Sequence, residues 1–399
     1  MKILCSISFI FLLLDYSAQQ TIVQNVFLRS NFGTQSFCGS EQMDVFGITH
    51  SLMASPVIPA PTIYCNEGDS LVLNALSISQ GDHHTVHLHG MDVNTRNDGD
   101  PMTSFWLNHM QDTTYSVRAN HAGTYIYHCH VGDVAHVQMG MYGLIVIRAA
   151  GGANTAWTGG PAFDSEHAWI TSEVDQFWHD NIPVHDELAD TVHIPVYEPD
   201  YFLVNGKCGN DLQDELIYAE VNAKIYLRLC NIGFYSNHYT FPAELNAEII
   251  DSDGRPLPES FFSNELEIMP GERYGVMLTP SALMNGVVSI DFINMNTGVV
   301  HGTENVPVQI VLVDVKENSN STGLQVYPNP GDGILSFTTN GKISSNCRFK
   351  VFDGQGRQVL EKTIYSTEKL NLEELQEGCY ILQVCDKQHF YSTTFVLLR

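Results

Sequence analysis

The sequence predicts an all-β chain made of β-barrels or β-sandwiches with short strands. Short runs such as Pro61–Tyr64, Ser70–Asn74 and Tyr142–Ile147 alternate or are continuously apolar, and they are rich in β-branched residues. Proline, glycine and asparagine interrupt these runs, and the chain carries no convincing helical period. At about 150 residues per domain, the 399 residues correspond to two or three domains.

The composition favours a globular protein and excludes some partners. Hydrophobic residues make up 44% of the chain and charged residues 16%, which is atypical of a disordered protein. The 45 acidic side chains outnumber the 19 basic ones, for a formal net charge of -26. Electrostatic repulsion therefore argues against nucleic acid or an anionic membrane surface as the partner.

Residues 1–18 have the pattern of a secretory signal peptide. Lys2 is followed by an apolar run that ends at Leu14, and the small residues Ser17 and Ala18 close the segment. The run is too short to span a bilayer, and no other stretch is long and apolar enough to do so. We expect an exported chain with no membrane insertion, located outside the cell or at its surface after passing through the periplasm.

The first predicted domain, residues 19–150, is rich in histidine: nine of the seventeen histidines fall between His83 and His136. Successive side chains of a strand point to opposite faces, which separates Cys129 from its two neighbours and sorts the candidate ligands into two sets. The first set is two imidazoles, a thiolate and a thioether, the ligands of a blue copper site: His84, Cys129, His136 and Met141. The second set is paired imidazoles, suited to copper, zinc or iron: His87, His89, His128 and His130.

A structural zinc site and a disulfide both fit this pattern less well than copper does. A structural zinc site explains the paired histidines, but zinc does not use a methionine such as Met141 as a ligand. A disulfide is the usual fate of a secreted cysteine, yet the histidines on both sides of Cys129 argue for metal.

The segments His84–Gly90 and Gly123–Met141, with Asp98–Gly99, resemble the copper-binding signatures of multicopper oxidases and the related copper nitrite reductases. The resemblance covers residues 25–315 and implies cupredoxin-like Greek-key β-barrels. It implies that the first set binds type 1 copper and the second set a type 2/type 3 copper site. By this likeness the protein is a copper-dependent oxidoreductase that passes electrons from a small reducing substrate to dioxygen. Methionine at 141, where some laccases carry leucine, implies a lower type 1 potential.

The second predicted domain, residues 151–315, again has short strands but no obvious copper motif. Its segments Leu227–Gly233 and Met269–Val276 resemble the copper-free cupredoxin domain of multicopper oxidases. We expect Arg228 and Arg273, which lie in these segments, to form structural ion pairs.

The second domain also departs from the family, because none of its histidines forms an H-x-H pair. Three outcomes are open. In the first, unpaired histidines or a neighbouring subunit complete the cluster, and a neighbour would make the protein a homotrimer. In the second, the site holds a single type 2 copper, as in nitrite reductases, bound by His89, His128 and one histidine of a neighbour. In the third, only the type 1 centre functions. The second outcome gives a nitrite reductase-like enzyme, and the third gives a blue copper protein that carries electrons or binds copper without catalysis. His238 and His301 are the donors to inspect.

The end of the chain has the composition of a linker and a small β-sandwich. Residues 316–323 are polar and flexible in composition, and residues 324–399 alternate strands with glycine-rich turns. The motif Tyr327-Pro-Asn-Pro and the late strand at Gly378-Cys-Tyr resemble the C-terminal sorting domain of the bacterial type IX secretion system. This resemblance implies the type IX secretion machinery as a partner.

The cysteines agree with export. After those in the signal peptide, the tail and the copper set are set aside, four of the nine remain: Cys38, Cys65, Cys208 and Cys230. Two lie in each of the first two domains, which allows one disulfide per domain, although the pairing is not readable from the sequence.

Overall fold

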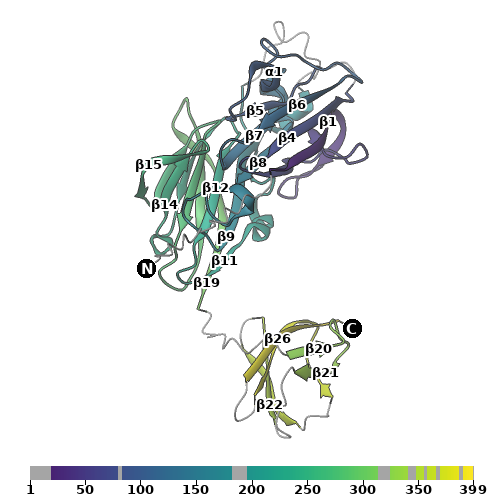
Figure 1. Ribbon diagram of the computed structural model, residues 1–399, viewed down its shortest axis with the longest axis vertical. Coiled ribbons are helices and arrows are strands. Elements are labelled where there is room, and N and C mark those ends of the chain that lie inside the picture. Colours follow the sequence, from purple (N-terminus) through teal and green to yellow (C-terminus); the bar gives the residue numbers. More distant parts are fainter. Residues whose placement is uncertain are drawn as a thin grey trace, which may run out of the picture. The chain divides into compact units, whose positions relative to one another are not determined.

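The computed structural model describes residues 19–79, 83–181, 196–312, 324–339, 347–354, 357–364, 369–385 and 390–398. The predicted signal peptide at 1–18 and the predicted linker at 316–323 lie outside these ranges. The chain divides into two compact units, Met1–Val313 and Asp314–Arg399 (Figure 1). Within the ranges given, none of the helices is long and apolar enough to cross a membrane.

The first half of unit 1 consists of two four-stranded sheets, with the orders β2-β1-β4-β6 and β3-β8-β7-β5. In β4, buried and less buried side chains alternate, as expected for a strand with one face on the core. The elements of this half are β1 (Thr21–Gln35), β2 (Met43–Thr49), β3 (Ala60–Asn66), β4 (Ser70–Ser77), β5 (His87–His89), α1 (Thr95–Asp98), β6 (Asp112–Arg118), β7 (Gly123–His128), α2 (Asp133–Gln138), β8 (Tyr142–Arg148) and the 3₁₀ turn η1 (Ala150–Gly152).

The second half of unit 1 pairs a six-stranded sheet, β10-β9-β12-β17-β14-β15, with a five-stranded sheet, β11-β19-β18-β13-β16. Its apolar core lies between these sheets and includes Trp169, Tyr239 and Phe292. The elements are β9 (Ser165–Val174), α3 (Gln176–Asn181), β10 (Tyr201–Val204), η3 (Gly209–Glu215), β11 (Ile217–Glu220), β12 (Ile225–Asn231), β13 (Ser236–Thr240), η4 (Ala243–Leu245), β14 (Glu248–Ser252), β15 (Arg255–Phe262), β16 (Glu265–Ile268), β17 (Arg273–Leu278), β18 (Met284–Asn294) and β19 (Val299–Val311).

Unit 2 is a smaller sandwich of a three-stranded sheet, β20-β21-β24, and a four-stranded sheet, β23-β22-β25-β26. Its core is separate and includes Leu335, Phe349 and Phe395. The strands are β20 (Leu324–Tyr327), β21 (Ile334–Thr339), β22 (Cys347–Asp353), β23 (Gln358–Ile364), β24 (Leu370–Asn371), β25 (Gly378–Cys385) and β26 (Phe390–Leu397). The prediction of an all-β chain is confirmed; the boundary after residue 150, which falls between β8 and β9, stays a prediction.

The two halves of unit 1 pack closely against each other. Strand β7 is buried along its whole length, because it contacts its own core and also β12 and β17 of the second half. A further apolar cluster combines Ile126 and Leu144 of the first half with Ile170 and Ile232 of the second. Unit 1 is therefore a single packed body, and the strand that carries His128 lies at the contact between its halves.

One expectation about the cysteines is wrong. Instead of one disulfide in each domain, Cys38 of the first half is bonded to Cys208 of the second, with Cα atoms 5.6 Å apart. Cys65 and Cys230 are buried and free. Cys65 lies on β3 in the first core, whereas Cys208 and Cys230 both pack in the apolar cluster shared by the two halves, where only Cys208 meets Cys38. The disulfide therefore joins the halves covalently.

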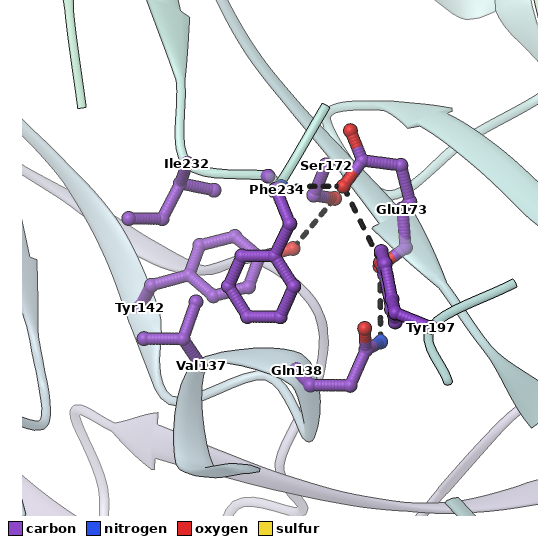
Figure 2. Close-up of a pocket in the computed structure, with 9 residues that line it drawn as sticks. Val137, Gln138, Tyr142, Ser172, Glu173, Tyr197, Ile232 and Phe234 are labelled. Carbon is purple, nitrogen blue, oxygen red and sulfur yellow. Dashed lines mark hydrogen bonds between the residues drawn. The ribbon is translucent and has the colours of Figure 1, made fainter. Parts of the chain in front are cut away.

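A buried carboxyl group, Glu173 on β9, supports the same contact from the second half. Its carboxylate accepts hydrogen bonds from the backbone N–H of Phe234 (2.8 Å) and from the Tyr197 hydroxyl (3.3 Å). Gln138, at the end of α2 of the first half, donates to the backbone carbonyl of Glu173 (3.0 Å; Figure 2). The small pocket around Glu173 is lined by residues of both halves.

The Glu173 carboxyl should make stability depend on pH. Burial raises its pKa to about 7, above the ordinary 4.5. The folded chain holds this proton more tightly than the unfolded chain. The contribution to the free energy of unfolding is therefore full below about pH 4.5 and is lost as the pH rises through about 7, on the order of 3 kcal/mol in all.

We predict that Glu173→Gln removes this pH-dependent loss of stability. The free energy of unfolding of the variant, measured with urea at several pH values between about 4.5 and 8, should fall less with rising pH than that of the parent protein. Buried histidines titrate in both proteins, so the comparison isolates Glu173. Parallel pH profiles would contradict the assignment.

Candidate metal centre

The register of β5 against β7 brings the first pair of histidines next to the second. In this antiparallel pair His87 lies opposite His128, and His89 lies opposite Ile126. His87 and His89 therefore project from the same face of β5, toward the side on which His128 lies. The alternation used in the sequence analysis thus holds for this strand pair.

Three predicted ligands meet inside the first half, and we call them the cysteine group: His84, Cys129 and His136. The Cys129 Sγ lies 3.6 Å from His84 Nδ1 and 3.3 Å from His136 Nδ1. All three side chains are buried, with at most 1% of their surface exposed. His84 comes from an isolated bridge with Leu107, so a short paired segment fixes it beside the end of β7.

A short helix places His136, which the sequence analysis did not anticipate. Helix α2 lies between Cys129 and Met141 and includes His136 in its last turn. The chain then returns, and the Met141 carbonyl accepts a hydrogen bond from the Cys129 N–H (3.0 Å). Met141 is fully buried. The wide spacing from Cys129 to His136 is thus taken up by one helical segment within an otherwise β fold.

A second set, which we call the histidine group, consists of His87, His89 and His128. Their ligand atoms all lie within 4.8 Å of one another. His130 is not part of this closest set, although its ring centroid is 4.9 Å from that of His87 and 5.7 Å from that of His128. The structure therefore brings three of the four predicted histidines together and places the fourth beside them.

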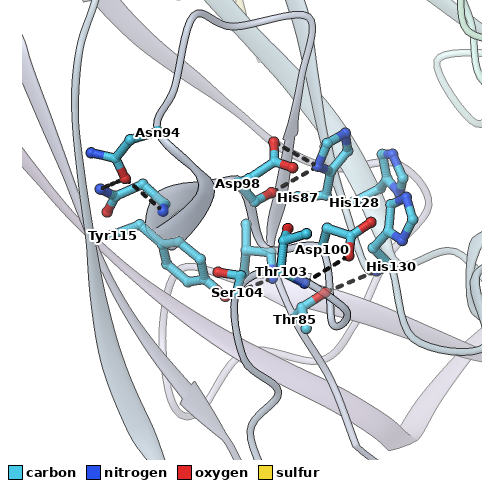
Figure 3. A network of polar contacts seen from close by, with 12 residues as sticks. Thr85, His87, Asn94, Asp98, Asp100, Thr103, Ser104, Tyr115, His128 and His130 are labelled. Atoms are coloured by element: carbon cyan, nitrogen blue, oxygen red, sulfur yellow. Dashed lines mark hydrogen bonds and ion pairs between the residues drawn. The ribbon is translucent and has the colours of Figure 1, made fainter.

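Hydrogen bonds orient the rings of His87 and His128. Figure 3 shows the His87 ring against Asp98, whose carboxylate Oδ1 lies 3.4 Å from His87 Nδ1. The Nδ1 of His87 lies 2.7 Å from the Asp98 carbonyl oxygen, and the Nδ1 of His128 lies 2.8 Å from the Cys129 carbonyl oxygen. Since a carbonyl only accepts, each Nδ1 carries the proton and donates it, which leaves the Nε2 lone pair for a metal. Beside them, Thr85 Oγ1 accepts a hydrogen bond from the His130 backbone N–H (3.1 Å).

The surroundings keep these imidazoles neutral, as metal binding requires. Burial, followed by the neighbouring His136, holds the pKa of His84 well below its usual value. Burial lowers the pKa of His128 to about 3. Burial and then the positive charge of Arg273 lower the pKa of His89 to about 4.

The donor atoms of the cysteine group suit a copper ion. Metal–nitrogen and metal–sulfur bonds of about 2.0 and 2.3 Å at a trigonal angle give a nitrogen–sulfur separation of about 3.7 Å. The observed distances from Cys129 Sγ, 3.6 and 3.3 Å, are close to this value. The group consists of two imidazoles and one thiolate, and the buried thioether of Met141 follows it in the sequence. This donor set is typical of blue copper centres and not of the sites of other common metals.

The second half supplies no imidazole to either group in the part of the chain that the structure describes. His238, on β13, lies 3.9 Å from a carboxylate oxygen of Glu265, and the ring of His301, on β19, packs against Tyr235. His185 and His193 lie outside the described residues. Among the described residues, the second half therefore adds no imidazole to the histidine group.

Two residues of the second half do reach the histidine group, which the sequence analysis missed. Gly271 lies against His89, and Arg273 lies against the neighbouring Gly90. Arg228 and Arg273 form the ion pairs that we expected, with Glu166 and Asp253 respectively. The proximity of Arg273 to His89 had no signal in the sequence, because it depends on how the two halves pack.

Comparison with protein families gives three matches. Residues 47–151 match a family model described as multicopper oxidase, and residues 170–310 match a second model with the same description. Residues 325–398 match the secretion system C-terminal sorting domain.

Similar curated proteins include plant copper oxidases. Laccase-25 of Oryza sativa subsp. japonica is 24% identical over 275 residues, covering 66% of this chain and 45% of that protein. L-ascorbate oxidase of Cucumis sativus is 26% identical over 327 residues, covering 75% of this chain and 52% of that protein. The chain thus spans about half the length of the curated relatives it matches.

Among solved structures, the blue copper oxidase from Nitrosomonas europaea is similar with a TM-score of 0.59 at 24% identity, covering 73% of this chain and 86% of that chain. Copper nitrite reductase from the same organism has a TM-score of 0.55 at 15% identity, covering 73% and 94%. These likenesses establish the cupredoxin fold predicted from the sequence.

We predict that Cys129→Ser abolishes the intense blue absorption of the copper-loaded protein, because this absorption requires a thiolate ligand. Cys65→Ser is the matched control, since Cys65 is another buried, free cysteine of the same half. The control should keep its colour. A blue Cys129→Ser protein would refute the cysteine group as the type 1 centre.

Met141→Leu should raise the reduction potential of the blue copper. Loss of an axial thioether removes a donor that stabilises the oxidised ion. We expect a change of roughly tenfold in the redox equilibrium, which is 59 mV for a one-electron couple, measured by titration at the blue band. Met139→Leu, at another buried methionine nearby, should leave the potential unchanged. Equal shifts in both variants would show that Met141 acts only through packing.

Proposed function

Because this chain belongs to the multicopper oxidase family and carries a secretion sorting domain, we propose that it is an exported copper oxidase. It would take single electrons from a small reducing substrate and reduce dioxygen. One observation carries the proposal: Cys129 lies in the cysteine group, while its neighbour His128 lies in the histidine group.

The residues divide the work between two copper sites. We assign His84, Cys129, His136 and Met141 to type 1 copper, and His87, His89, His128 and His130 to a type 2/type 3 site. Copper bound at these sites would supply the one-electron chemistry that connects the reductant to dioxygen. The donor sets support this assignment through their types, their burial and their neutral rings.

The chain itself provides a short connection between the sites. Cys129 and His128 are joined by one peptide unit, and the His128 Nδ1 donates to the Cys129 carbonyl oxygen. The ring of His128 is thereby tied to the backbone of the residue that carries the thiolate. Burial of both residues excludes water, which limits side reactions along the path.

The described residues of one chain bring only the histidine group and His130 to this site, and we propose that a neighbouring subunit supplies the further imidazoles. The second half places neither His238 nor His301 in a described ligand group. In a homotrimer, each chain would contribute histidine ligands to the site of the next chain and so supply the further imidazoles. The reducing substrate is a small molecule, and the sorting domain directs the protein through the periplasm to the cell surface or the medium by type IX secretion.

A second candidate is nitrite reduction at a single type 2 copper. The closest group contains three histidines, His87, His89 and His128, without His130, and three imidazoles suffice for one copper. The fold is compatible with this candidate, since a copper nitrite reductase is among the similar structures. A third candidate, a non-catalytic blue copper protein, would use the cysteine group alone.

Copper counting with parallel assays of oxygen and nitrite consumption separates these functions. About four coppers per chain with oxygen uptake is expected for the oxidase, about two with nitrite consumption for the second candidate, and about one with neither activity for the carrier. Analytical ultracentrifugation of the same sample gives the number of subunits. Four coppers per chain in a monomer would overturn the proposed sharing of ligands.

A further inference from the structure

The second half of the chain packs a turn and one strand end directly against His89. A Cβ added to Gly271 would lie 3.3 Å from His89 Cε1, and one added to Gly90 would lie 2.0 Å from Arg273 Nη2. Both glycines have positive φ values, 85° and 84°, so the close approach uses backbone that other residues rarely adopt. Gly271 therefore lies against the His89 ring, and the Arg273 guanidinium lies against the backbone of Gly90.

Arg273 is held rigidly in this position. Its Nη1 donates to the Gly271 carbonyl (2.7 Å) and pairs with Asp253 (2.9 Å). Its Nε donates to the carbonyl of Thr124 on β7, the strand that also carries His128 (3.3 Å). The guanidinium thus connects the strand of the histidine group to the second half.

The charge of Arg273 is only partly compensated. Its side chain is 5% exposed, whereas that of Asp253 is 48% exposed. Water screens the carboxylate far more than the buried guanidinium, so a net positive field remains at His89. A fixed positive charge beside a metal disfavours its more highly charged, oxidised form.

We propose that Arg273 is a positioning residue for the histidine group: it holds Gly271 against the ring of His89 and raises the reduction potential of the copper bound there. The inference rests on the proposed function, since it requires copper in this group. The second half then contributes a buried cation beside the histidine group.

The test compares full-length, copper-loaded variants by redox titration, with the non-blue copper followed by electron paramagnetic resonance and the blue copper by its absorption. Arg273→Gln should shift the non-blue couple about tenfold toward the oxidised form, which is 59 mV for one electron. Asp253→Asn, at a half-exposed position, should shift it in the opposite direction and by a smaller amount, because water screens this carboxylate. The blue copper should keep its potential in both.

Matched controls separate this effect from a general role at the contact between the halves. Arg228 is fully buried, donates to Thr124 Oγ1 (3.3 Å) and pairs with Glu166 (2.9 Å), like Arg273 with its own partners. Arg228→Gln and Glu166→Gln should leave the non-blue potential unchanged.

Each outcome decides the question. Opposite shifts with Arg273→Gln and Asp253→Asn, absent from the controls, support the proposal. An unchanged non-blue potential in Arg273→Gln overturns it, and so does a shift of Asp253→Asn toward the oxidised form or an equal shift in the controls. Absence of non-blue copper in the parent protein would refute the proposed function and the inference together, whereas parent copper with unresponsive variants refutes the inference alone.

Discussion

At the end of β7, the backbone sends the side chain of Cys129 to one face of the strand and that of His128 to the other. The consequences extend through the first half. On the face toward the core, the side chains of His84 and His136 lie beside Cys129. On the opposite face, those of His87 and His89 lie beside His128. Because adjacent residues belong to different groups, neither group can shift without moving the other, and the register of β5, the bridge of His84 and helix α2 are all set relative to this point.

The second constraint is the cost of burying so many imidazoles without charge. The hydrogen bonds that fix their tautomers end on backbone carbonyls, of Asp98 for His87 and of Cys129 for His128, and the Asp98 carboxylate lies 3.4 Å from His87 Nδ1. These contacts raise the pKa of the rings, but burial outweighs them and the pKa of both rings is lowered. The buried positive charges lie at the contact with the second half, where Arg228 and Arg273 both bond to Thr124.

The sequence predicted the all-β class, the sorting domain and the two ligand sets, because period-two alternation and residue spacing are local properties of a strand. It did not predict helix α2, since six residues between Cys129 and His136 are too few to display a helical period. Neither the pairing of Cys38 with Cys208 nor the contact of Arg273 with His89 was predictable. Both depend on how the two halves of unit 1 pack, and no spacing along the chain encodes that arrangement.

The disulfide between Cys38 and Cys208 encloses all eight ligands assigned to the two copper sites, from His84 to Met141, in one covalent macrocycle. A single backbone cut anywhere between the two cysteines leaves the chain in one piece until a reductant is added. The ring also fixes an order of events: it closes only after the second half is present and an oxidant is available. Before closure, the thiols of Cys38 and Cys208 are themselves soft copper ligands that compete with Cys129, so oxidation of this pair both locks the halves together and removes two rivals for the metal.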